Sequence, residues 1–266
     1  DVRIKYIDKI NEGPSLSRKS GTEQAKGKYI QYLDSDDFLQ ENAIEYLTDK
    51  AEATNAEVVA APFFFYYSEN KMDISGHFSF QEMTGMEYFN EILSGRAYWS
   101  VWSNFLSRSL FARNDISFVP EISFGEDAIL MVQLLYHTQK VVALEQPILY
   151  YRQIESSICH DITPKRHEDL RTYTKWIERF MIEKGLYESY RNNLILKNIE
   201  MAFLCMHWGY YENADKDMKC IVKDIKKRPQ LLKCLPGRQR KIIKVYRFSS
   251  WLGFLNLMHY KKQGKL

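Results

Sequence analysis

The chain has 266 residues, which is enough for one large domain or two smaller domains with a sizeable core. Its 45% hydrophobic and 27% charged residues exclude a disordered chain and are typical of a globular protein. The net charge of +3 is unevenly distributed: residues 225–266 contain twelve Lys or Arg and no Asp or Glu, and the rest carries 25 basic and 34 acidic side chains. An acidic body without a recognisable nucleic-acid-binding module argues against a nucleic-acid-binding protein.

Strands and helices are predicted to alternate over the first 67 residues. Apolar runs of high β-propensity predict the strands, and amphipathic patterns with Pro or Gly at their ends predict the helices. The predicted elements are a strand at 2–7, a helix at 14–27, a strand at 28–33, a helix at 41–54 and a strand at 56–67. Such alternation favours an α/β unit with a mainly parallel sheet.

Two more helices are predicted at 84–95 and 126–138, and residues 140–153 predict one or two short strands. Beyond Pro164 the pattern changes to long helical segments with hardly any Gly or Pro. We therefore expect an α/β domain at residues 1–160 and a helical region at 161–266.

The cysteines suggest a compartment. Cys159, Cys205, Cys220 and Cys234 are far apart and form no CxxC pair, and no signal peptide is recognisable at the start. These features predict reduced thiols and a cytoplasmic location.

Three aspartates, Asp34, Asp36 and Asp37, follow the predicted strand at 28–33. Carboxylates this close repel one another unless a cation, a helix N-terminus or water stabilises their charge. At the carboxyl end of a parallel strand, two of them can hold Mg²⁺ or Mn²⁺ while the metal binds phosphate oxygens. The alternative is helix capping by Asp36 or Asp37. An aspartate-nucleophile phosphatase does not fit, because the small residue and Thr that it needs do not follow.

The basic tail contains the apolar stretch 248–260, flanked by Arg247 and by Lys261 and Lys262. This stretch is too short to span a bilayer, which takes about 20 apolar residues. Its composition favours a helix lying in the headgroup region of an anionic membrane. Packing of the same helix on the protein body is the alternative.

Four ordered segments resemble the family 2 glycosyltransferases of the GT-A fold: residues 11–37, 101–111, 116–130 and 147–158. The first, NEGPSLSRKSGTEQAKGKYIQYLDSDD, follows the family pattern N-x-G-(L/P)-S-x-(A/S)-R-N-x-G, then A-x-G-x-Y-I and D-S-D-D. The matching positions are Asn11, Gly13, Pro14, Ser15, Ser17, Arg18, Gly21, Ala25, Gly27, Tyr29 and Ile30. The other three resemble the family's V-W-N-K-L-Y-x-R-x-L-F, F-x-E-x-x-x-x-E-D and P-x-Y-x-Y-R-x-x-x-x-S-I segments.

The resemblance implies a Rossmann-like GT-A domain that transfers a sugar from a nucleotide diphosphate, with a UDP-sugar as the expected donor, to an acceptor hydroxyl with inversion. It implies that Asp36 binds Mn²⁺ or Mg²⁺ on the diphosphate and that Asp34 lies near the metal and the donor ribose. It also implies that Arg18 faces the nucleotide.

On the acceptor side, the resemblance implies that Asp127 is the general base, with Glu126 beside it. Inversion independently requires a carboxylate opposite the leaving group, and Arg152 can add positive charge at the diphosphate. Trp102 and Asn104 are candidates for contact with the acceptor. The alternatives are that Glu126 and Asp127 cap a helix, that Arg152 forms a surface pair and that Trp102 belongs to the core.

The chain departs from the family pattern at Lys19 and at Ser103 and Asn104, and it opens without the family's usual N-terminal nucleotide-binding βαβ segment. We therefore expect an N-terminally truncated GT-A domain. A membrane-associated enzyme at the inner face of the plasma membrane, acting on a surface polysaccharide or a lipid-linked glycan, is the favoured interpretation. A non-catalytic remnant that binds a partner is the alternative.

Overall fold

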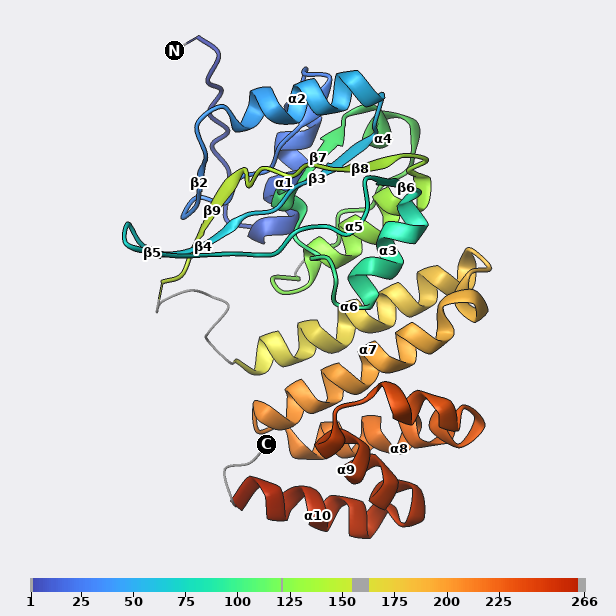
Figure 1. Ribbon diagram of the computed structural model, residues 1–266. Helices are drawn as coiled ribbons and strands as arrows, with labels where there is room; N and C mark the ends of the chain where they lie inside the picture. The colour runs from blue at the N-terminus through green and yellow to red at the C-terminus, as the bar shows by residue number, and fades with distance from the viewer. Residues whose placement is uncertain (1, 121, 155–162, 263–266) are drawn as a thin grey trace. The chain divides into compact units, whose positions relative to one another are not determined.

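The computed structural model describes residues 2–120, 122–154 and 163–262, and the chain separates into two compact units, Asp1–Asp161 and Ile162–Leu266 (Figure 1). The first unit is a mixed α/β domain with two sheets, and the second is helical. The predicted fold class, an α/β domain followed by a helical C-terminal region, is confirmed.

A five-stranded sheet forms the centre of the first unit, in the order β1-β7-β3-β8-β6. Its strands are β1 (Tyr29–Ile30), β3 (Val58–Ala60), β6 (Glu82–Met83), β7 (Asn104–Ser107) and β8 (Val141–Ala143). A second sheet has the order β2-β9-β4-β5, with β2 (Phe38–Leu39), β4 (Phe64–Ser68), β5 (Lys71–Ile74) and β9 (Leu149–Arg152).

The expectation of mainly parallel pairing is wrong for the described strands. Only β3 with β8 and β4 with β9 pair in parallel, and five other pairings are antiparallel. The strand β7 lies between β1 and β3 and pairs antiparallel with both of them.

Two strand predictions need correction. Residues 2–7 form no strand: Val2 is 100% and Tyr6 87% exposed, and no described strand lies beside this segment to supply backbone hydrogen bonds. The apolar run at 56–67 forms two strands, β3 and β4, which belong to different sheets. Pro62 lies between them and lacks the N–H that a continuous ladder would need.

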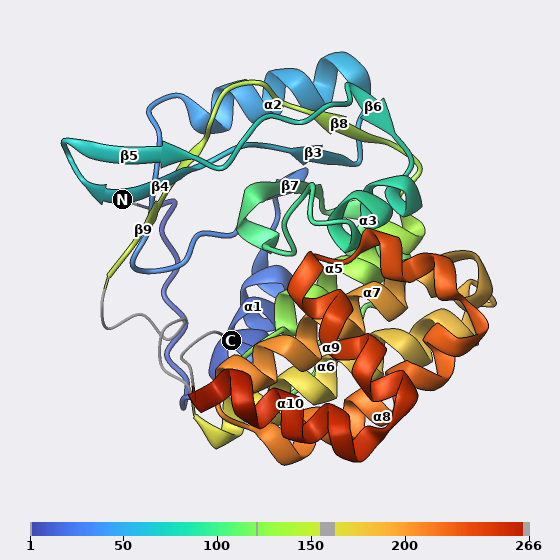
Figure 2. The same cartoon turned by 60° about the horizontal axis from the view of Figure 1, so that its bottom comes forward.

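Six helical segments complete the described part of the first unit: α1 (Gly13–Gln24), α2 (Ala43–Thr54), α3 (Gly85–Leu93), η1 (Val101–Ser103), α4 (Ser109–Arg113) and α5 (Glu126–His137). Helix α2 covers one side of the sheets, and α3 and α5 lie on the other (Figures 1 and 2). Helix α5 is buried from Ala128 to Leu135, so it is a core helix with its first turn held in place.

The second unit contains α6 (Pro164–Glu183), α7 (Tyr187–His207), α8 (Tyr211–Lys227), η2 (Pro229–Cys234), α9 (Gly237–Phe248) and α10 (Ser250–Lys262). Consecutive helices pack on one another, and their apolar faces supply a core that includes Tyr173, Ile199, Met218 and Ile243. Cys205, Cys220 and Cys234 are free thiols, whereas Cys159 lies outside the described residues. In the described part of the chain, no helix combines the length and the apolar character needed to cross a membrane.

Candidate active site

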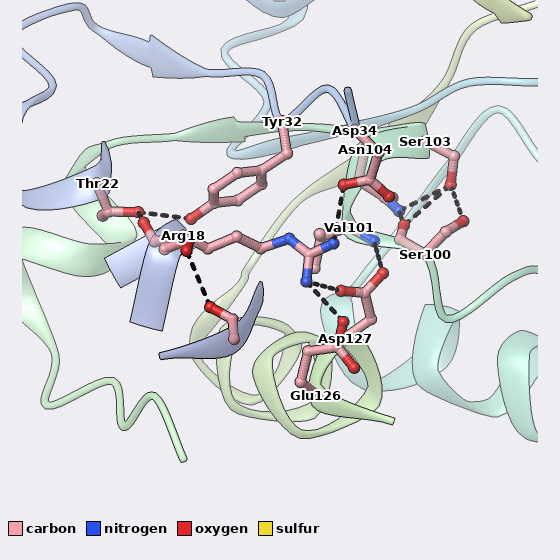
Figure 3. A network of polar contacts seen from close by, with 12 residues as sticks. Arg18, Thr22, Tyr32, Asp34, Ser100, Val101, Ser103, Asn104, Glu126 and Asp127 are labelled. Carbon is pink, nitrogen blue, oxygen red and sulfur yellow. Dashed lines mark hydrogen bonds and ion pairs between the residues drawn. The ribbon is translucent and has the colours of Figure 1, made fainter. Parts of the chain in front are cut away.

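Arg18 is the centre of a charged cluster built from three separate parts of the first unit (Figure 3). Its side chain, on α1, is only 10% exposed. One guanidinium nitrogen, Nη2, lies 3.1 Å from Asp34 Oδ1; the other, Nη1, lies 2.8 Å from Glu126 Oε1 and 2.9 Å from Asp127 Oδ1. The structure therefore brings the predicted donor-side carboxylate and the predicted catalytic pair together through one cation.

Local contacts fix the start of helix α1, which carries Arg18, and the position of this helix in the first unit. Asn11 Oδ1 accepts a 3.0 Å hydrogen bond from the Gly13 backbone N–H, and Pro14 occupies the first turn, where its missing N–H has no cost. One turn beyond Arg18, the Thr22 hydroxyl bonds to Arg18 O at 2.8 Å and lies 2.6 Å from the Tyr32 hydroxyl. These contacts hold the helix against the segment that leads to Asp34.

The aspartate cluster forms a turn, closed by a 3.1 Å hydrogen bond from the Asp37 N–H to Asp34 O. Asp37 is buried, and its Oδ1 accepts a 2.8 Å hydrogen bond from the backbone N–H of Arg152 in β9. The capping interpretation is wrong, because strand β2 follows the turn and α2 begins at Ala43 without a side-chain cap. Asp37 instead fixes the turn to the second sheet, and burial raises its pKa to about 6.

Asp127 lies in the first turn of α5, directly after Glu126. Its Oδ2 accepts a 3.1 Å hydrogen bond from the Val101 backbone N–H, whereas Oδ1 is close to Arg18 without hydrogen-bond geometry. Burial raises the pKa of Asp127 to about 7; the positive charge of Arg18 opposes this rise, and the negative charge of Glu126 adds to it. A carboxyl group with such a pKa can accept a proton near neutral pH.

In this cluster a single guanidinium, that of Arg18, contacts several carboxyl groups, so acidic groups outnumber basic ones. Burial acts to lower the pKa of Arg18, but the carboxylates of Asp127, Asp34 and Glu126 outweigh burial and raise it, so the guanidinium stays charged. The N-terminus of α5 adds the positive end of the helix dipole beside Glu126 and Asp127. The guanidinium lies against these carboxylates, so the structure does not favour the predicted orientation of Arg18 toward the nucleotide.

Asp36 is the carboxylate best suited to hold a metal ion. It makes no hydrogen bond or ion pair with another described residue, whereas Asp34 is paired with Arg18 and Asp37 with a backbone N–H. Oxygen ligands of this kind suit Mg²⁺ and Mn²⁺. No three acidic, His or Cys side chains among the described residues are grouped to enclose a metal ion, so phosphate oxygens and water would complete the coordination of any ion here.

Arg152 occupies the end of β9, and its backbone N–H is the donor to Asp37. Its exposed side chain places the guanidinium carbon 5.5 Å from the centre of the Phe38 ring. No salt bridge joins Arg152 to a described carboxylate, so the surface-pair interpretation has no support there. The guanidinium remains available beside the aspartate turn.

The side chains of Trp102 and Asn104 are buried, so neither offers much surface for direct contact with an acceptor. The Trp102 ring is 7% exposed and stacks on Tyr151 with ring centres 5.0 Å apart. Asn104 is 0% exposed, and its Nδ2 donates to Ser100 O at 2.8 Å. Both side chains support the segment that carries the Val101 N–H.

The Val101 N–H is a site feature that sequence reasoning missed. Every residue except proline has a backbone N–H, so the residue type at position 101 does not reveal this donor. Asn104, two residues beyond the tryptophan, is buried in the structure and belongs to this local hydrogen-bond network, but its burial cannot be read from the sequence.

Comparison with known proteins agrees with this geometry. Residues 1–116 match the family model described as Glycosyl transferase family 2. The whole chain aligns at 24% identity with 82% of "Uncharacterized glycosyltransferase EpsJ" of Bacillus subtilis (strain 168). It also resembles the "Cholesterol galactosyltransferase" of Borreliella burgdorferi, at 26% identity over 71% of this chain and 55% of that protein.

Among solved structures, S. aureus TarS 1-349 in complex with UDP-GlcNAc is similar, with a TM-score of 0.61 and 14% identity over 97% of this chain and 74% of that chain. The fold is thus that of the GT-A glycosyltransferases, and the protein is a glycosyltransferase. Within that class, residues 1–116 of the chain resemble glycosyltransferase family 2.

Proposed function

We propose that the protein transfers a sugar from a nucleotide-diphosphate donor, a UDP-sugar, to an acceptor hydroxyl with inversion at the anomeric carbon. The observation that carries the proposal is Asp127: a half-buried carboxyl group at the first turn of α5, aligned by Val101 N–H and Arg18, with a pKa raised to about 7. That is the kind of group an inverting reaction needs opposite the leaving diphosphate.

In the proposed reaction, Asp127 takes the proton of the acceptor hydroxyl as its oxygen attacks the anomeric carbon. The bond between that carbon and the diphosphate oxygen breaks, and the electron pair leaves with the diphosphate. Val101 N–H orients Asp127, and Glu126 keeps Arg18 beside it. Arg18 is assigned a positioning role instead of nucleotide contact, because both of its terminal nitrogens already face carboxylates.

On the donor side, Asp36 is proposed to bind Mn²⁺ or Mg²⁺, with Asp34 beside it near the ribose. The metal would neutralise charge on the diphosphate. Arg152 lies next to the aspartate turn through Asp37 and is proposed to face the leaving diphosphate as well.

The acceptor is proposed to belong to a surface polysaccharide or a lipid-linked glycan. A relative that supports this is the "Minor teichoic acid biosynthesis protein GgaB" of Bacillus subtilis, 25% identical over 85% of this chain and 24% of that protein. We place the protein in the cytoplasm, peripherally at the inner face of the plasma membrane, where such acceptors are made available.

Calorimetric titration of UDP into the protein tests the donor site, first with Mn²⁺ and then with EDTA. We expect binding that requires Mn²⁺, that is lost in Asp36→Ala and that is kept in Asp127→Asn. Binding that is insensitive to EDTA and to Asp36→Ala would contradict the metal assignment.

A panel of UDP-sugars and glycan acceptors then tests the chemistry by release of UDP. We expect Asp127→Asn to lower turnover by about 10²–10⁴-fold while UDP affinity is unchanged. Equal turnover by the wild type and Asp127→Asn would remove Asp127 from the mechanism. If the wild type binds UDP in a metal-dependent way but releases no UDP from any donor, a binding role would instead be favoured.

A further inference from the structure

The end of the second unit exposes an apolar surface, formed by Phe248 at the end of α9 and by Trp251, Leu252 and Leu255 on α10. These side chains are 86%, 67%, 39% and 45% exposed, respectively. At 3.6 residues per turn, the three on α10 fall within an arc of about 100°. We call this set the α9–α10 apolar corner.

The opposite face of α10 is the one that packs on α9. Leu257 is fully buried, and a Cβ at Gly253 would come within 2.4 Å of the Tyr246 ring. The exposure of the corner is therefore not a consequence of loose packing of α10, because the helix already has a tightly packed side. Large exposed apolar side chains that follow one another along the end of α9 and the start of α10 mark an interaction site.

The charges on the α9 face that carries Phe248 identify the kind of partner. Lys241 and Lys244 are exposed on α9, and no ion pair joins either of them to another described residue. With about 100° between successive residues, these two lysines share a face of α9 with Phe248. The whole segment from residue 225 to the end has no acidic side chain.

We infer that the α9–α10 apolar corner inserts into the interface of an anionic lipid bilayer, with Lys241 and Lys244 against its headgroups. Exposed Trp, Phe and Leu beside basic residues is the pattern of a helix that lies on a membrane without crossing it. The inference deepens the membrane part of the proposed function and does not depend on the catalytic roles.

Co-sedimentation of the full chain with vesicles tests the inference. One set of vesicles contains phosphatidylcholine alone, the other contains phosphatidylcholine with about 30% phosphatidylglycerol, and the same mass of lipid is used for both. We expect binding to the anionic vesicles only, reduced by salt. Lys241→Gln/Lys244→Gln should weaken it about 30-fold, because each basic residue near the surface contributes about a fivefold factor. Phe248→Ser/Trp251→Ser should weaken it at least about tenfold.

Matched controls carry the same changes elsewhere on the surface. Lys26→Gln/Lys71→Gln removes two exposed charges, and Ile44→Ser/Ile182→Ser removes two exposed apolar side chains, 46% and 58% exposed. We expect both controls to bind vesicles like the wild type.

Absence of binding to anionic vesicles, or equal loss in the test and control variants, would overturn the inference. Self-association without lipid that Phe248→Ser/Trp251→Ser abolishes, together with no vesicle binding, would also overturn it and assign the corner to a protein partner. Calorimetry with UDP and Mn²⁺ on the same variants separates the two proposals: retained UDP binding without vesicle binding defeats this inference alone.

Discussion

At the scale of single residues, the site depends on the shape of the Arg18 guanidinium. Its two terminal nitrogens serve carboxylates from the aspartate turn and from α5 at the same time. A lysine could not do this, because its single ammonium is a point charge without a planar fork of donors. Arg18 therefore stabilises an arrangement of carboxylates that would otherwise repel one another.

Replacing Arg18 with Met should lower the free energy of unfolding by about 1–3 kcal/mol, because it leaves the half-buried carboxyl groups of Glu126 and Asp127 without their cation. Urea unfolding followed by circular dichroism measures the change. Arg113→Met is the matched control: Arg113 is 62% exposed and pairs with Glu57, so we expect a loss of about 0–1 kcal/mol. Similar losses in the two variants would show that Arg18 is not a buried structural cation.

The raised pKa of Asp127 predicts a pH profile. Because a general base must be ionised, turnover should rise with pH to a plateau, with a midpoint near the pKa of about 7. In Glu126→Gln a neighbouring negative charge that raises this pKa is removed, so the midpoint should move to lower pH while activity persists. Loss of all activity in Glu126→Gln would instead identify Glu126 as the base.

At the scale of elements, the position of α5 is set by its contact with α3. Gly85, the first residue of α3, packs so closely on the end of α5 that an added Cβ would lie 2.0 Å from Leu135 O. The capping box between Thr84 and Glu87 fixes the start of α3 at that point. The helix that presents Asp127 at one end is thus anchored at the other.

We expect Gly85→Ala to destabilise the first unit by at least about 1–3 kcal/mol, because a backbone oxygen cannot move aside as a side chain can. Gly21→Ala is the control: no atom lies within 4 Å of its added Cβ, and an alanine inside α1 should stabilise by about 0.5–1 kcal/mol. Thermal unfolding of both variants measures the difference. An unchanged melting temperature in Gly85→Ala would mean that α3 and α5 separate at little cost.

Local signals predicted the helices better than the strands. Helices at 41–54, 84–95 and 126–138 follow from amphipathic or capping patterns that lie within each segment, and the structure places α2, α3 and α5 there. Strand pairing depends on distant partners, so the insertion of β7 between β1 and β3 could not be read from local sequence.

The same distinction applies to the site. Asp34, Arg18, Glu126 and Asp127 were identified from motifs, and the structure brings them together. The orientation of Arg18 and the contact from Val101 N–H depend on packing between α1, η1 and α5, which no motif specifies.

At the scale of the whole molecule, the two units differ in how their cores are built. In the second unit, consecutive helices from α6 to α10 supply each other's apolar partners. Packing between helices that are neighbours in the chain is a property of a domain that can fold alone.

We expect a protein made of residues 163–266 alone to keep its helical circular dichroism and to unfold cooperatively in urea. Its core residues, which include Ile199 and Ile243, lie on helices that pack on one another within that segment. A disordered spectrum would show that the helices need the first unit. A fragment ending at residue 227, which lacks α9 and α10, is the comparison and should be less stable, because α8 then loses a packing partner.

The parallel pairing of β3 with β8 also limits how fast the first unit can fold. Val58 pairs with Val141, so the residues between them, about half of the first unit, must close into a loop before the middle of the sheet can form. The helical unit makes its contacts between neighbours in the chain and faces no such delay. During refolding from urea, helical structure in the second unit should therefore precede the central sheet, and the charged cluster around Arg18 should be among the last parts to form.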